Sequence, residues 1–144
     1  VLDFAIARER QAQEIYVSYS RVTDRKSFSQ LLLTMADMEK EHERRLTELK
    51  GQRAWASTLA GSGPEQFSLE EPFKPVTFSP DMEYGDFLVL VIQKETEAER
   101  LYLHLEGLAA SADARRLFRH LAGEEKKHRD WAQEAYDRDV RPDN

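Results

Sequence analysis

Cysteine is absent from the 144 residues of this sequence. Without a thiol the chain has no disulfide, no thiolate nucleophile and no cysteine-ligated zinc or iron–sulfur centre. Any redox chemistry must therefore use other ligands. A lack of cysteine also suits the cytoplasm, which is where we expect the protein to be found.

Long hydrophobic runs are missing as well. The longest uninterrupted apolar run, residues 87–92, is much shorter than the roughly 20 residues that a helix needs to cross a bilayer. The first residues do not show the pattern of a signal peptide. The net charge of −6 disfavours phosphate binding, because nucleic-acid-binding proteins usually carry a clustered basic face. We therefore expect one soluble domain over residues 1–144 that binds neither membrane nor nucleic acid.

Proline and glycine are scarce outside one segment. Four of the five prolines and three of the six glycines lie in residues 51–80, which we interpret as a long connection. Elsewhere, apolar residues at helical spacing predict helices at residues 2–22, 27–50, 79–108 and 114–138. Ser79 is the expected N-cap of the third helix, with Pro80 in its first turn. Short links within the first and second pairs of helices then predict an all-α four-helix bundle, with one long crossover between helices two and three.

The two halves of the chain repeat each other at an offset of 86 residues. In the second and fourth predicted helices, a glutamate and a histidine three residues later interrupt an otherwise apolar seam. The first and third helices each carry one glutamate on their inward stripe. Helix rise brings the two glutamates of each hairpin to one height, if the turns fall near residues 24 and 110. The identical pairs are Glu9/Glu95, Ala12/Ala98, Tyr16/Tyr102, Ala36/Ala122, Glu39/Glu125 and His42/His128.

Four carboxylates buried together would be expensive, because each loses hydration and repels the others. Two divalent cations balance the four negative charges, and two histidines can each supply a neutral nitrogen. Dinuclear iron and manganese bundles use this set of ligands, with one Glu from each of two helices and Glu-x-x-His from each of the others. A buried polar network without metal is the alternative. The predicted metal ligands are Glu9, Glu39, His42, Glu95, Glu125 and His128.

Four motifs resemble the ferritin-like superfamily, and the rubrerythrin-type domain more closely than ferritin: AIARERQAQEIY, LLTMADMEKEH, LVIQKETEAERLY and LFRHLAGEEKKH. The resemblance implies a ferritin-like fold and two iron ions on the six ligands, with Glu39 and Glu125 as bridges. It also implies that Tyr16 and Tyr102 form hydrogen bonds close to the metals; plain core packing is the alternative for both.

The sequence departs from that family pattern in two ways. It lacks the cysteines of a rubredoxin module, so electrons must come from an external donor. Ala98 stands where the family usually has a further carboxylate, and we interpret the nearby Glu97 and Glu99 as surface residues. His104 and His120 have no glutamate three residues before them, so surface or packing roles are expected.

The function implied by the resemblance is that of a diiron oxidoreductase that reacts with hydrogen peroxide or dioxygen, as a rubrerythrin-like peroxidase or a ferroxidase. Two alternatives stay open, namely a protein that binds, delivers or stores iron without turnover, and a metal-free interaction module. Manganese or a mixed metal pair fits the same ligands as iron. The resemblance also implies a homodimer.

Overall fold

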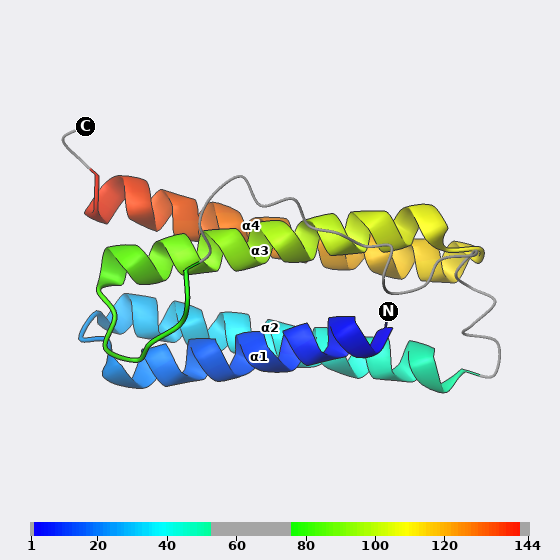
Figure 1. The fold of residues 1–144 in the computed structure, drawn as a ribbon, viewed down its shortest axis with the longest axis horizontal. Coiled ribbons are helices and arrows are strands. Elements are labelled where there is room, and N and C mark those ends of the chain that lie inside the picture. Colours follow the sequence, from blue (N-terminus) through cyan, green and yellow to red (C-terminus); the bar gives the residue numbers. More distant parts are fainter. Residues whose placement is uncertain (1, 53–75, 142–144) are drawn as a thin grey trace.

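Four long helices form the protein in the computed structural model, which describes residues 2–52 and 76–141. They are α1 (Leu2–Val22), α2 (Lys26–Gly51), α3 (Tyr84–Leu108) and α4 (Ala112–Asp139). In Figure 1, α1 and α2 form one antiparallel layer, and α3 and α4 form a second layer stacked on it. The links within each pair are short and contain residues 24 and 110, as predicted. The predicted all-α four-helix bundle is confirmed.

The connection between α2 and α3 joins opposite ends of the bundle, because α2 ends at one end and α3 begins at the other (Figure 1). Its last part, residues 76–83, contains no strand. Val76 and Phe78 pack against the core, and the Val76 N–H donates a hydrogen bond of 3.0 Å to the side chain of Gln93. None of the four helices, over the residues that the structure describes, combines the length and apolarity of a membrane span.

Helix α3 begins at Tyr84, and the predicted start at Ser79 is wrong. The Ser79 carbonyl accepts a hydrogen bond of 3.1 Å from the N–H of Met82, which closes a turn. The Ser79 hydroxyl donates a hydrogen bond to the side chain of Asp81 and does not cap a helix. Ser at the first position and Pro at the second also favour a β-turn, so the same local signal fits both structures. Here Pro80 lies in the turn.

The apolar core consists of two clusters with a polar belt between them. One cluster contains Leu46 and Phe118, and the other contains Leu32 and Phe87. Every helix contributes residues to both clusters, and its predicted metal ligands lie between these two sets of residues. The candidate ligands are therefore shielded from water along the bundle axis in both directions.

The hydroxyl of Ser111 caps helix α4 by accepting a hydrogen bond of 3.1 Å from the N–H of Ala114. We expect Ser111→Ala to lower the free energy of unfolding by about 1 kcal/mol, because a backbone donor at the helix start loses its partner. Urea denaturation of the metal-free protein measures this change. Thr34→Ala, at an exposed position within α2, is the control and should cost nothing, since alanine favours helix interiors. Equal losses in the two variants would contradict the prediction.

Candidate metal centre

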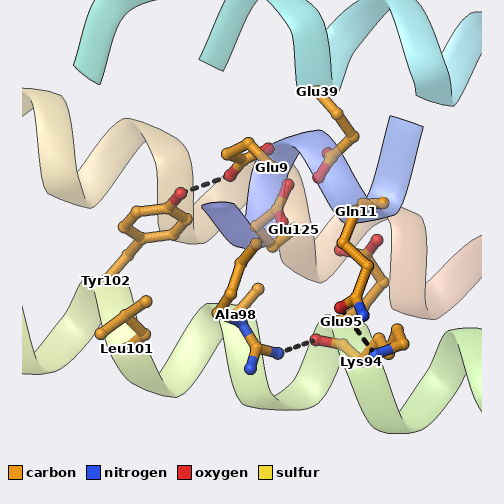
Figure 2. A pocket seen from close by; sticks show the side chains of 11 residues that line it. Glu9, Gln11, Glu39, Lys94, Glu95, Ala98, Leu101, Tyr102 and Glu125 are labelled. Carbon is orange, nitrogen blue, oxygen red and sulfur yellow. Dashed lines mark hydrogen bonds between the residues drawn. The ribbon is translucent and has the colours of Figure 1, made fainter. Parts of the chain in front are cut away.

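All six predicted ligands lie buried at mid-length of the bundle. Helices α1 and α3 each contribute one glutamate, while α2 and α4 each contribute a glutamate and a histidine on one face, three residues apart. Figure 2 shows the four carboxylates converging from different helices. The exposed fractions are Glu9 2%, Glu39 1%, His42 2%, Glu95 1%, Glu125 1% and His128 0%.

The six side chains form two overlapping groups of candidate ligands. The first, which we call the His42 position, consists of Glu9, Glu39, His42 and Glu125. The second, the His128 position, consists of Glu39, Glu95, Glu125 and His128. Within each group, one ligand atom from every residue lies within 4.8 Å of the others. Glu39 and Glu125 belong to both groups, so their location fits the bridging role that the resemblance implied.

Several buried polar atoms of this cluster have no hydrogen-bond partner among the residues that the structure describes. Such atoms are rare in proteins, and each costs about 1–3 kcal/mol when left unpaired. The residues that carry these atoms belong to the two groups of mutually close ligand atoms, and four carboxylates match the charge of two divalent ions, so the residues fit a dinuclear metal site. The unpaired atoms are Glu9 Oε2, Glu39 Oε1, His42 Nδ1 and Nε2, Glu95 Oε2, Glu125 Oε1 and His128 Nδ1.

The chain matches the model of a known protein family. The rubrerythrin family model matches residues 1–82 and 86–143 of the chain. The chain belongs to the rubrerythrin family. A solved structure with a similar fold is the hypothetical protein Pfu-1136390-001 from Pyrococcus furiosus, with a TM-score of 0.70 and 23% sequence identity over 94% of this chain and 85% of that chain. A comparison with curated proteins finds no match. The resemblance and the ferritin-like fold inferred from the sequence are confirmed.

Two tyrosines connect the layers of this rubrerythrin-family bundle at the site. The Tyr16 hydroxyl donates to Glu95, and the Tyr102 hydroxyl donates to Glu9 (Figure 2 shows the second bond). Burial, and then the charge of the nearby carboxylates, raises the pKa of both hydroxyls well above the ordinary value, so both keep their protons. Tyr16 and Tyr102 are thus core residues and hydrogen-bond donors at once. Each orients a glutamate that belongs to one group only.

Two carboxyl groups of the rubrerythrin-family site, those of Glu39 and Glu125, resist ionisation when no cation balances them. Burial, followed by the charge of neighbouring glutamates, raises the pKa of Glu39 and Glu125 well above the ordinary value. Burial alone would lower the pKa of His42, but the carboxylates of Glu125 and Glu9 outweigh it and raise that pKa to about 10. The metal-free site therefore holds protons, and metal ions have to displace them.

A small cavity of about 20 Å³ lies against the candidate ligands. That space is enough for roughly one water-sized molecule. Ala12 and Ala98, which are equivalent positions of the repeat, leave room for it beside the carboxylates (Figure 2 labels Ala98). The position where the family usually has a further carboxylate is thus a buried alanine that faces the cavity. The other lining residues are Arg8, Glu9, Gln11, Glu39, Lys94, Glu95, Leu101, Tyr102 and Glu125.

Glu97 and Glu99 lie outside both ligand groups and stay partly exposed, in line with the expected surface role. Both are half-buried, and both pair with arginines on neighbouring helices. Glu97 Oε2 lies 2.7 Å from Arg8 Nη2, and Glu99 pairs with Arg129. These contacts between helices depend on packing, which the sequence pattern does not reveal.

His128 has two neighbours that the sequence interpretation did not single out. Its Nε2 lies 3.3 Å from Sδ of Met38, and its ring lies beside Trp131 at a centroid distance of 5.5 Å. The contact with Met38 depends on how the helices pack, and no spacing in the sequence indicates it. The other two histidines lie outside both ligand groups, as expected; they are His104, half-buried, and His120, exposed.

Proposed function

We propose that this rubrerythrin-family protein is a diiron-carboxylate oxidoreductase that reacts with hydrogen peroxide or dioxygen, as a peroxidase or a ferroxidase. The main support is the symmetric, buried ligand set, in which Glu39 and Glu125 are shared by two groups. Carboxylate oxygens and neutral imidazoles, with no thiolate, suit iron, and manganese to a similar degree. Elemental analysis distinguishes the two metals.

Each part of the site has a task in this proposal. When bound, ferrous iron would supply the electrons that reduce the oxidant. Glu39 and Glu125 hold the two positions together, and the hydroxyls of Tyr16 and Tyr102 orient the two remaining glutamates. The apolar clusters on both sides exclude water. The cavity of about 20 Å³ admits an oxidant no larger than a few atoms.

Returning the site to its reduced state requires electrons from outside the chain. The sequence has no cysteine and hence no rubredoxin-type iron centre of its own. An external electron donor is therefore part of the proposal, and so is a homodimer. Iron storage in a large cage would need a different assembly, so a dimer in light scattering would count against storage.

Anaerobic iron loading tests the proposed reaction. The metal-free protein is loaded with two ferrous ions per chain and mixed with hydrogen peroxide or with dioxygen in a stopped-flow instrument. We expect rapid oxidation by at least one oxidant, and the ratio of the two rates separates peroxidase from ferroxidase activity. A protein that binds two iron ions but stays inert to both oxidants would contradict the enzymatic proposal, and would favour iron binding or delivery.

A larger side chain in the cavity should hinder access of the oxidant and leave metal binding unchanged. Because Ala98 lines the cavity, Ala98→Val should slow oxidation by hydrogen peroxide about tenfold or more, as one or two extra methyl groups do in a tight pocket. Two iron ions per chain should still bind. Ala36→Val is the matched control, since Ala36 is also buried but does not line the cavity. Equal rates in the two variants would show that the cavity is not the route of the oxidant.

A further inference from the structure

A surface groove adjoins the small cavity at the candidate ligands. The groove has a volume of about 520 Å³ and is lined by residues of α1, by residues 76–78 and by Lys94 of α3. It shares two lining residues with the cavity of about 20 Å³, namely Gln11 and Lys94. Lys94 Nζ donates a hydrogen bond of 3.1 Å to Gln11 Oε1, and Gln11 is exposed (Figure 2). The Lys94–Gln11 contact therefore lies between the open groove and the cavity that reaches the ligands.

The repeat places an equivalent contact beside the same cavity. The offset of 86 residues converts Arg8 into Lys94 and Gln11 into Glu97. Both cationic side chains line the cavity. Arg8 Nη2 lies 2.7 Å from Glu97 Oε2, and it also donates a hydrogen bond of 3.4 Å to the carbonyl of Lys94. Two contacts between α1 and α3, related by the repeat, thus cover the cavity on its way to the surface.

The two contacts differ in strength. Arg8 and Glu97 carry opposite charges, and both side chains are half-buried, so water and salt screen their attraction only in part. The acceptor of Lys94 is a neutral amide, and the bond is longer. Because Gln11 is exposed, water competes for both partners of this bond. The Lys94–Gln11 contact is therefore the easier of the two to open, and it is the one that faces the groove.

We infer that the oxidant enters from this groove, between α1 and α3, and that the Lys94–Gln11 contact closes the entrance to molecules larger than hydrogen peroxide. This inference rests on the proposed reaction with an oxidant. Exposed side chains change rotamer within nanoseconds, so the contact opens without any movement of the helices. A molecule of a few atoms then passes from the groove into the cavity beside Glu9 and Glu95. Gln11 thereby sets the size of the oxidant.

Two hydroperoxides of different size test the entrance. We expect the unmodified ferrous protein to react with hydrogen peroxide about tenfold faster than with ethyl hydroperoxide, since a tight passage rejects two extra carbons. Gln11→Ala removes the acceptor of Lys94 and leaves space at the entrance, so it should remove most of that difference. Gln13→Ala is the matched control, because Gln13 also belongs to α1 but lines neither the groove nor the cavity. It should leave the ratio of the two rates unchanged.

Firmer closure should have the opposite effect. Gln11→Glu places a carboxylate at the position equivalent to Glu97 and gives Lys94 an oppositely charged partner. Oxidation by hydrogen peroxide should become slower at low salt and recover at high salt, which screens an exposed ion pair. The relaxation of water protons in the Mn²⁺-loaded protein is a readout independent of the reaction, because it reports how readily water reaches the metal. Gln11→Ala should increase this relaxation, and Gln11→Glu should decrease it.

Two results would overturn the inference while leaving the proposed function intact. One is the same ratio of hydroperoxide rates in the unmodified protein and in Gln11→Ala. The other is water relaxation that changes with neither substitution of Gln11, and this measurement decides also if dioxygen alone reacts. A protein that binds iron but stays inert to both hydrogen peroxide and dioxygen is a different outcome, because it would contradict the proposed function itself.

Discussion

Metal-free and metal-loaded protein should respond to pH in opposite directions. Glu39 and Glu125 have a folded-state pKa raised well above the ordinary 4.5. Above pH 4.5 the unfolded chain releases these protons while the folded protein keeps them, so rising pH favours unfolding until the folded pKa is passed. The loss is up to about 1.4 kcal/mol per pH unit for each group. His42 acts in the same direction between pH 6.5 and about 10, since its folded pKa is raised across that range. The metal-free protein should therefore be most stable in mild acid.

Bound metal should reverse this trend, because the ligands bind metal only after they lose their protons. Raising the pH from 5 to 8 should then strengthen binding and hence stability. Metal at 100 times its dissociation constant adds about 2.7 kcal/mol per site. Urea denaturation at pH 5, 6.5 and 8, with chelator or with Mn²⁺, measures both slopes. Parallel slopes with and without Mn²⁺ would contradict the prediction.

Glu39→Gln should abolish tight metal binding at both positions and yet stabilise the metal-free protein. Glu39 belongs to both ligand groups, so neither position keeps its full set. The amide is neutral at every pH, whereas the carboxyl of Glu39, in a site that is almost completely buried, has to take up a proton or carry a charge beside other carboxylates. We expect the free energy of unfolding of the metal-free protein to rise by about 1–3 kcal/mol near pH 8, where the glutamate is most costly.

Two further variants calibrate the Glu39→Gln result. Glu9→Gln disables one position, so one metal ion per chain should remain. Glu97→Gln removes a carboxylate that pairs with Arg8 outside the site, so two ions should remain. Metal content after loading and urea denaturation of the metal-free proteins give both readouts. If the Glu39→Gln protein keeps two tightly bound ions, or if its metal-free form is less stable than the unmodified protein, the account of the buried charges is wrong.

The sequence predicted the bundle and the gathering of the six side chains because both follow from short-range rules. Helical periodicity places Glu39 and His42 on one face, and the offset of 86 residues places Glu125 and His128 in the same way. Within each pair of helices, the two glutamates lie equally far along the chain from the turn, so they come to the same level of the bundle.

Other features could not be predicted because they depend on contacts between helices. Met38 reaches His128 from another helix, and Glu97 reaches Arg8 from another layer of the bundle. Neither contact leaves a spacing in the sequence. The start of α3 was misplaced for a different reason, since Ser79 and Pro80 fit a turn and a helix start equally well.

We propose that four buried glutamates and two histidines gather at mid-bundle because they hold two divalent metal ions. The most direct test is the metal content of the purified protein, measured by elemental analysis after anaerobic loading with ferrous iron and removal of free metal. We expect two ions per chain, both released by a chelator at low pH. A protein that is folded but retains no metal after this treatment would contradict it.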